Sequence, residues 1–214
     1  MKVLLFGAGG KVGSALAPRL VAAGHEVTLA GPGDDTDPAG HDAAVDFTRP
    51  DAVRANVERC IDAGVPVVVG TTGLTDDDLA ALDARARAAG VACFVAPNFA
   101  LGAVLMMRFA AAAARHLPRA EIVEAHDERK VDAPSGTAKA TAAAMGGDVE
   151  IHSIRLPGLV AHQEVLLGGE GQLLTIRHDT FSREAFAPGV LLALDRLYSL
   201  PGGVTVGLDA LLDS

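Results

Sequence analysis

The residues with the clearest potential for chemistry lie between positions 124 and 138. His126 and Lys130 follow a short apolar run, and Ser135-Gly136-Thr137 follows a proline at the expected start of a helix. An imidazole titrates near neutral pH and can deliver a proton. A lysine ammonium and the amides of a helix N-terminus can bind a carboxylate. The segment is therefore a candidate site at which a carboxylate is bound and a proton is delivered.

The same residue types also suit a charged, solvated loop followed by a capped helix, and residue types alone do not separate the two interpretations. Two more specific sites lack support. His126 is not part of an HExxH zinc-binding pattern, and Ser135 lacks the GxSxG surroundings of a hydrolase nucleophile. We therefore expect no metal site here.

A second candidate site is the glycine-rich segment Gly7 to Gly13, which follows the apolar run Lys2 to Phe6. Gly7, Gly10 and Gly13 form a GxxGxxG variant of the dinucleotide-binding fingerprint. Glycines between a strand and a helix let the backbone approach a pyrophosphate, and the helix N-terminus supplies amide donors. The pattern favours nucleotide binding, with a tight turn that binds no ligand as the alternative.

The choice between NADH and NADPH stays open from these residues. A carboxylate at the end of the second strand normally holds the adenosine ribose. Here that strand ends in Leu29-Ala30-Gly31-Pro32, and the nearest carboxylates are Asp34 and Asp35. Lys11, inside the glycine loop, could pair with a phosphate or lie solvated on the surface.

Strand and helix patterns alternate through about residue 97, which predicts an open α/β sheet. Thr75 and Asp78 have the spacing of a capping box at the start of one helix. The predicted strands are 2–6, 25–30, 43–47, 65–69 and 91–96, and the helices between them are 14–23, 50–63 and 75–90.

The pattern changes after residue 100. A helix over 101–117, a strand over 120–125 and a helix near Pro134 precede β-type runs at 149–156, 160–167 and 173–178, which predict antiparallel hairpins. A last helix over 183–200 tolerates Pro188 only near its start. The predicted fold is a Rossmann-like parallel-sheet domain (1–100 plus 184–214) that binds a dinucleotide. An inserted α+β domain (101–183) serves for substrate binding and oligomerisation.

Composition narrows the function classes. Half of the 214 residues are hydrophobic, and 18 Lys+Arg against 27 Asp+Glu give a net charge of -9, which disfavours nonspecific nucleic-acid binding. No window approaches the roughly 18 consecutive apolar residues of a membrane span. The N-terminal run leads into glycines rather than a cleavage site, so we expect a cytoplasmic protein. Cys60 and Cys93 fit neither a disulfide framework nor a CxxC pair and are predicted to be core thiols.

The segment Glu124 to Ala138 closely resembles the signature of the dihydrodipicolinate reductase family of diaminopimelate and lysine biosynthesis. Other blocks agree with that family in order, and together they cover nearly the whole chain. They are the loop 7–13, Val45-Asp46-Phe47-Thr48, Gly70-Thr71-Thr72-Gly73, Ala96-Pro97-Asn98-Phe99, the stretch 155–162 and Phe186-Ala187-Pro188-Gly189-Val190.

The resemblance implies a homotetrameric reductase that transfers hydride from NADH or NADPH to 4-hydroxy-tetrahydrodipicolinate, a small dicarboxylate, giving tetrahydrodipicolinate. It also implies three groups of cofactor-binding residues. These are Gly7, Ala8, Gly9, Gly10, Lys11 and Val12 in the glycine loop, then Gly70, Thr71 and Thr72 on the nicotinamide side, and Ala96, Pro97, Asn98 and Phe99.

By the same resemblance, His126 is the general acid and Lys130 binds the substrate and donates a proton, while Ser135, Gly136 and Thr137 hold a substrate carboxylate. Asp127 stands where the family often has a second, substrate-contacting histidine. Its carboxylate should repel a dianionic substrate unless it points away or pairs with Arg129. The chain also looks shorter than typical members, after its second strand and after Thr137.

Two other functions remain open. One is a nucleotide-binding sensor without turnover, against which the retained His126, Lys130 and Ser135-Gly136-Thr137 argue. The other is a related Rossmann reductase of a different small imine or keto acid, which Asp127 keeps open.

Overall fold

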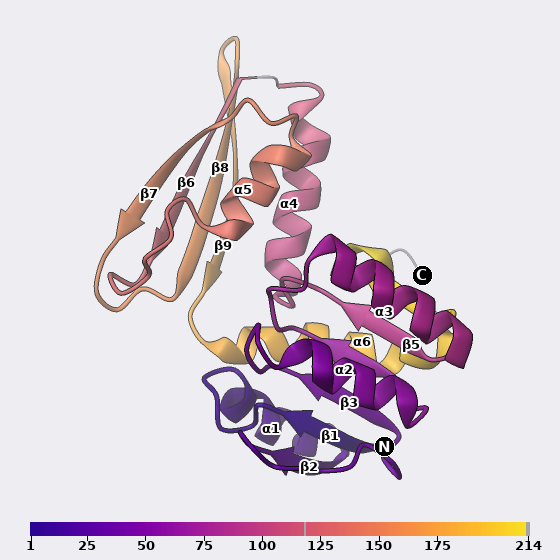
Figure 1. Cartoon of the computed structure of the whole chain (residues 1–214). Coiled ribbons are helices and arrows are strands. Elements are labelled where there is room, and N and C mark those ends of the chain that lie inside the picture. Colours follow the sequence, from indigo (N-terminus) through magenta and orange to yellow (C-terminus); the bar gives the residue numbers. More distant parts are fainter. Residues whose placement is uncertain (118, 213–214) are drawn as a thin grey trace. The chain divides into compact units, whose positions relative to one another are not determined.

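The computed structural model describes residues 1–117 and 119–212, and the chain divides into two compact units (Figure 1). Unit 1 comprises Met1–Phe99 and Arg183–Ser214, and unit 2 comprises Ala100–Ser182. Each unit has its own sheet. The predicted domain ranges also include residues 118, 213 and 214, which lie outside the described residues.

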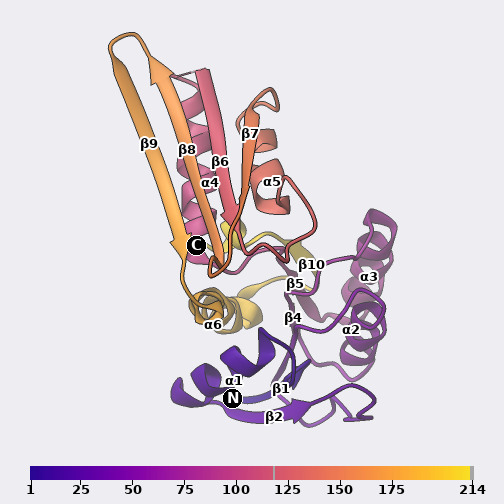
Figure 2. The ribbon, with the colours of Figure 1, turned by 90° about the vertical axis from the view of Figure 1, so that its left-hand side faces the viewer.

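Unit 1 is a six-stranded sheet in which every paired strand is parallel, in the order β10-β5-β4-β3-β1-β2. Helices α1 and α6 lie on one face and α2 and α3 on the other (Figure 2). This arrangement confirms the predicted Rossmann-like fold class. The strands are β1 (Lys2–Phe6), β2 (Glu26–Ala30), β3 (Ala43–Asp46), β4 (Val67–Val69), β5 (Ala92–Val95) and β10 (Gly203–Val206), and the helices are α1 (Gly13–Ala22), α2 (Val53–Asp62), α3 (Asp76–Ala89) and α6 (Ala187–Arg196).

The central strands of this sheet are covered by helices on both faces. All residues of β3 and β4 are buried, the pattern of a parallel strand between two helical layers.

The predicted capping box is confirmed at the start of α3: Thr75 Oγ1 accepts the Asp78 N–H at 3.1 Å, and Asp78 accepts the Thr75 N–H at 3.0 Å. Cys60 and Cys93 are buried free thiols, as predicted, and burial raises the pKa of each to about 12.

The C-terminal part of unit 1 differs from the prediction. The single helix expected over 183–200 is divided into a 3-10 turn (Arg183–Phe186), α6 and a second 3-10 turn (Leu197–Ser199). Pro188 lies in the first turn of α6, where its missing N–H costs no helical hydrogen bond. Strand β10 was not predicted because its four residues give too short an apolar pattern. The strand forms because it pairs with β5, a contact that its local sequence does not reveal.

Unit 2 is a four-stranded sheet in the order β7-β6-β8-β9, with α4 and α5 on one face (Figure 2). Its core includes Met106, Ile122 and Val165. None of the helices in the described part of the chain is long and apolar enough to span a membrane. The elements are α4 (Leu101–Ala114), β6 (Arg119–His126), α5 (Gly136–Ala144), β7 (Glu150–Arg155), β8 (Ala161–Gly169) and β9 (Gln172–Thr180).

The predicted succession of antiparallel hairpins in unit 2 is only partly correct. Strands β8 and β9 form a hairpin, but β7 and β8 do not pair, because β6 lies between them. Strand β7 instead runs parallel to β6, and α5 provides the long crossover that a parallel pair requires. The residues Pro157-Gly158 between β7 and β8 form a turn, which changes the chain direction without specifying the partner strand. The consequence is that β6 and β7 end side by side.

Candidate functional site

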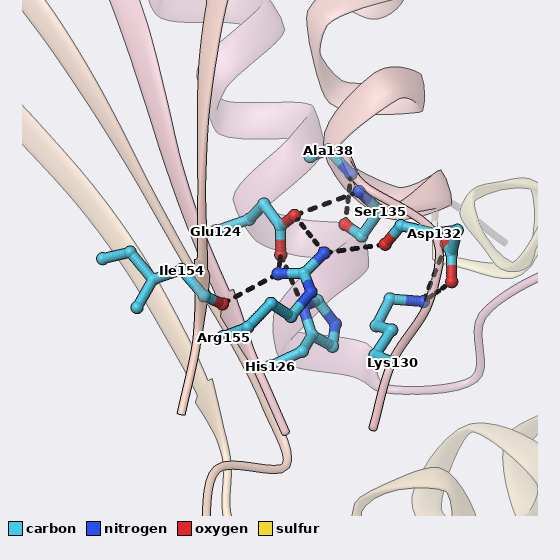
Figure 3. Close-up of polar contacts among 8 residues, drawn as sticks. All are labelled: Glu124, His126, Lys130, Asp132, Ser135, Ala138, Ile154 and Arg155. Atoms are coloured by element: carbon cyan, nitrogen blue, oxygen red, sulfur yellow. Dashed lines mark hydrogen bonds and ion pairs between the residues drawn. The ribbon is translucent and has the colours of Figure 1, made fainter. Parts of the chain in front are cut away.

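The paired ends of β6 and β7 bring the candidate catalytic residues of unit 2 together (Figure 3). Glu124 and His126 are two residues apart on β6, so both side chains point to the same face of the sheet. His126 lies opposite Arg155 in the parallel register. A turn closed by the Lys130 N–H to Asp127 carbonyl bond, 3.0 Å long, then leads toward α5.

Glu124 is the buried centre of this group. Its carboxylate accepts hydrogen bonds from Arg155 Nη1 and Nη2 at 2.9 and 2.8 Å, from the Ser135 N–H at 3.2 Å and from His126 Nδ1 at 2.5 Å. Burial alone would raise the pKa of Glu124, but the bonds from Arg155, Ser153 and His126 outweigh it and hold that pKa at about 2. The side chain is therefore ionised at neutral pH.

His126 has one ring nitrogen engaged by the protein. Its Nδ1 is bonded to Glu124, and its side chain is 15% exposed. Burial lowers the pKa of His126 below its usual value; the bond to Glu124 opposes this, and the charges of Lys130 and Arg155 add to it. The imidazole is therefore largely neutral at pH 7 in the free protein, and Nε2 is the nitrogen left to exchange a proton.

Lys130 brings a cation to the same place. Its Nζ donates to both carboxylate oxygens of Asp132, at 2.7 and 2.8 Å. The hydrogen bond from Lys130 lowers the pKa of Asp132. The ammonium is thus already bound to a carboxylate, that of Asp132.

The third predicted group lies at the N-terminus of α5. Ser135 is the buried N-cap residue, and its Oγ accepts the Ala138 N–H at 3.2 Å. The first amides of a helix, here those of Gly136 and Thr137, have no partner within the helix. Together with the helix dipole they suit an anion. Gly136 and Thr137 therefore begin a helix whose first amides suit an anion, and Ser135 caps that helix.

Asp127 is paired with Arg129. The Arg129 Nε and Nη2 donate to its two oxygens at 2.6 and 3.2 Å. The charge that distinguishes this chain from the resembled pattern is therefore balanced by a cation two residues away.

The predicted cofactor segments of unit 1 meet at one edge of its sheet. The register pairs Phe6 with Asp46, Asp46 with Val69, and Val69 with Val95. The residues that follow these strand ends, including Gly7, Gly70 and Ala96, therefore form a row where an open α/β sheet binds ligands. A cavity of about 470 Å³ opens at this edge. It is lined by Phe6, Gly7, Gly9, Gly10, Gly31, Pro32, Gly33, Asp34, Phe47, Thr48, Arg49, Ala52 and Asn56.

The glycine loop fits a dinucleotide. Gly7 has a φ of +79°, and a Cβ there would overlap the Phe47 carbonyl. A Cβ on Gly13 would overlap the Gly7 carbonyl, so only glycine allows the loop to close against the start of α1. Exposed Gly9 meets no such obstacle and leaves space beside the backbone. This open, glycine-lined turn at a helix N-terminus is the cradle that a pyrophosphate requires.

The other predicted cofactor residues have different surroundings. Thr71 is buried, and its hydroxyl donates to Asp46 Oδ1 at 2.5 Å, which fixes the loop rather than facing solvent. Phe99 is buried against the rings of Phe47 and Phe94. Lys11, Thr72 and Pro97 are exposed and Val12 is half-buried, and the cavity lining given above includes none of the four. Ala8 and Asn98 are half-buried.

Comparison with known proteins identifies the family. The family model described as dihydrodipicolinate reductase, N-terminus, matches residues 34–99, and that of the C-terminus matches residues 102–212. The chain belongs to the dihydrodipicolinate reductase family. It is 47% identical to the 4-hydroxy-tetrahydrodipicolinate reductase of Beutenbergia cavernae, over 100% of this chain and 99% of that one. It is 49% identical to the enzyme of that name from Moorella thermoacetica, over 79% and 72%.

A solved structure supports the same family. The dipicolinate-bound dihydrodipicolinate reductase of Paenisporosarcina sp. TG-14 matches with a TM-score of 0.88 and 33% identity, over 99% of both chains. The alignment with the Beutenbergia enzyme spans 245 positions, more than the 214 residues of this chain, so this chain is the shorter. Reductases of this family use NADH or NADPH, held by the Rossmann-like N-terminal domain that unit 1 represents.

Sequence reasoning did not assign three residues of this dihydrodipicolinate reductase fold. Glu124 and Arg155 surround His126, and buried Asp46 accepts hydrogen bonds from Thr48, Asn56 and Thr71 beneath the cofactor loops. A carboxylate two residues before His126 on a strand was a usable signal, because it lies on the same face. Arg155 gave no local signal, since only the β6–β7 register brings it to Glu124.

Proposed function

We propose that the protein reduces 4-hydroxy-tetrahydrodipicolinate to tetrahydrodipicolinate in diaminopimelate and lysine biosynthesis, with NADH or NADPH as reductant. The observation that carries this is the placement of His126 and the α5 N-terminus on one buried carboxylate, with the charge of Lys130 beside His126, in a chain whose full-length relatives bear this name. The dipicolinate bound by the Paenisporosarcina protein supports a small dicarboxylate as the substrate class.

The chain's residues have separate roles in this reaction. Loss of the carbon 4 hydroxyl of the substrate as water leaves an unsaturated imine ring, and a nicotinamide held beside the glycine loop would supply the hydride for carbon 4 of that ring. Lys130 and the amides of Gly136 and Thr137 bind and orient substrate carboxylate, and the Lys130 charge stabilises the electron density that the hydride adds. His126 donates a proton from Nε2 to the neighbouring ring carbon.

Substrate binding and the protonation of His126 are expected to be coupled. In the free protein the pKa of His126 is lowered, and an imidazolium there faces Lys130 and Arg155. A dianionic substrate brings two negative charges that favour the imidazolium. Substrate binding is therefore expected to raise the pKa of His126 and to favour the protonated acid in the complex.

The test is oxidation of NADH and NADPH, followed by near-UV absorbance, with the substrate generated in place by its upstream synthase. Rapid oxidation supports the proposed function, and inhibition by dipicolinate supports the dicarboxylate pocket. Nucleotide binding without oxidation would favour the sensor. Oxidation only with another imine or keto acid would favour the related reductase.

We further propose that the chain prefers NADH, because Asp34 supplies the missing carboxylate beside the ribose. Asp34 Oδ2 accepts the Gly31 N–H at 2.7 Å, which holds it at the end of β2 within the cavity lining. A carboxylate there binds a ribose hydroxyl and repels a 2′-phosphate. Arg49, the cation in the lining, is paired with Asp51 at 2.6 Å. Asp34→Ala is therefore expected to shift the ratio of dissociation constants toward NADPH by about tenfold, or 1.4 kcal/mol.

Binding can be measured by the change in reduced-nicotinamide fluorescence, without turnover. Asp35→Ala is the matched control, because the Asp35 side chain is fully exposed and outside the cavity lining. An unchanged ratio in Asp34→Ala, or an equal shift in both variants, would contradict the assignment.

We also propose that the protein is a cytoplasmic homotetramer built through the sheet of unit 2. The face opposite α4 and α5 carries apolar side chains that a partner would cover, including Leu173, which is 67% exposed, and Ile154. Light scattering is expected to give a tetramer mass, and Leu173→Glu is expected to reduce it. Val21→Glu, at an exposed position of α1, is the control. A monomeric wild-type protein at micromolar concentration would refute the tetramer.

A further inference from the structure

One carboxylate joins three elements of unit 2. Glu124 is fully buried, and both of its oxygens accept hydrogen bonds (Figure 3). Oε2 accepts from His126 Nδ1 and Arg155 Nη1, whereas Oε1 accepts from Arg155 Nη2 and the Ser135 N–H. The group thus connects the imidazole on β6, the guanidinium at the end of β7 and the first turn of α5.

The bond to Glu124 decides which ring nitrogen of His126 carries the proton. An ionised carboxylate only accepts hydrogen bonds, so His126 Nδ1 must be the donor. Nε2 is then the nitrogen that takes up a proton and passes it on. A neutral imidazole without such a partner divides between two tautomers, of which only one exposes a basic Nε2.

Arg155 extends the same network toward Lys130. Its Nη2 also donates to the Asp132 carbonyl at 2.7 Å, and the Asp132 side chain holds Lys130 Nζ. Arg155 therefore contacts both the carboxylate that orients His126 and the loop that carries the lysine. A buried ion pair of this kind contributes little to stability compared with apolar packing of the same volume, so its cost is better explained by what it positions.

We propose that Glu124, held by Arg155, is a positioning residue of the reductase site: it fixes His126 in the Nδ1–H tautomer and at a set distance from the N-terminus of α5. This inference rests on the proposed function. It assigns Glu124 no contact with substrate, only control of the acid and of the turn that receives the carboxylate.

Two variants separate positioning from packing. Glu124→Gln keeps the shape of the side chain and removes its charge, whereas Glu124→Asp keeps the charge on a shorter stem. Positioning predicts that kcat falls about 100-fold or more in Glu124→Gln, by analogy with the orienting carboxylate of serine-protease triads, with a smaller change in KM. It predicts a kcat for Glu124→Asp at least tenfold higher than that of Glu124→Gln. A packing role predicts instead that Glu124→Gln is the more active of the two variants. Glu170→Gln, in the exposed β8–β9 turn, makes the same chemical change as a control.

The pH profile of kcat/KM provides a second test, because a loss of packing alone would not shift it. The charged groups that face His126 are Glu124 on β6, Arg155 on β7 and Lys130 in the following loop. Removing the Glu124 charge leaves two cations beside the imidazole. The descending limb of kcat/KM is therefore expected at lower pH in Glu124→Gln than in the wild type.

The tautomer can be read without substrate. Nitrogen-15 NMR of the histidine side chains, assigned with a His126→Gln sample, is expected to show His126 protonated on Nδ1 in the wild type. Protonation on Nε2, or a Glu124→Gln protein with kcat within twofold of wild type, would overturn the proposal. Failure of the wild type to reduce the substrate would refute the proposed function instead, and the spectrum would still decide the tautomer even if Glu124→Gln did not fold.

Discussion

Replacing Lys130 with alanine is expected to lower kcat by about 10²- to 10³-fold, the usual effect of removing one group that stabilises charge in the transition state. KM is expected to rise as well, because the same ammonium binds substrate carboxylate. Lys130 reaches the site from a loop whose Asp132 already holds its Nζ at 2.7 Å, so a carboxylate fits its present position. The measurement is steady-state kinetics with the substrate generated in place.

The control for Lys130→Ala is Lys139→Ala, which removes an exposed lysine of α5 beyond its first turn. Dissociation constants for NADH and NADPH should equal those of the wild type in both variants, since Lys130 belongs to unit 2 and the glycine loop to unit 1. A wild-type kcat in the Lys130→Ala variant would show that Lys130 takes no part in the reaction. Lost nucleotide binding would indicate a general structural effect.

Replacing His126 with glutamine is expected to lower kcat by about 10²- to 10⁴-fold, the range for loss of a positioned general acid. Glutamine can still donate a hydrogen bond to Glu124, so the buried carboxylate keeps a partner. His116→Gln, at an exposed position beyond the end of α4, is the matched control and should be fully active. Equal rates in the two variants would mean that another group delivers the proton.

The pH dependence of the wild type follows from the same residue. A general acid must be protonated, and the pKa of His126 in the free protein lies below its usual value because of burial. The profile of kcat/KM reports the free protein, so it should fall as the pH rises through this lowered pKa. The profile of kcat reports the complex, in which the dianion raises that pKa, so its descending limb should lie at higher pH. Both limbs should be absent in His126→Gln.

The sequence by itself determined most of unit 1. Continuous apolar strands, the glycine loop and the capping box at Thr75 are local signals with one stable outcome each, and they predicted the parallel sheet and its ligand-binding edge. The segment from Glu124 to Ala138 likewise carried its own signature, because His126, Lys130 and the helix start at Ser135 lie close together in the sequence.

Only the tertiary structure decided how those residues are held. Hairpin signals after residue 149 favoured pairing of β7 with β8, whereas β7 pairs with β6 through a crossover. Strand pairing depends on long-range packing, which a local pattern does not encode. That register places Arg155 against Glu124 and so fixes the imidazole of His126. The residues suited to the chemistry can thus be identified from the sequence. Their protonation states and partners depend on contacts between segments about thirty residues apart.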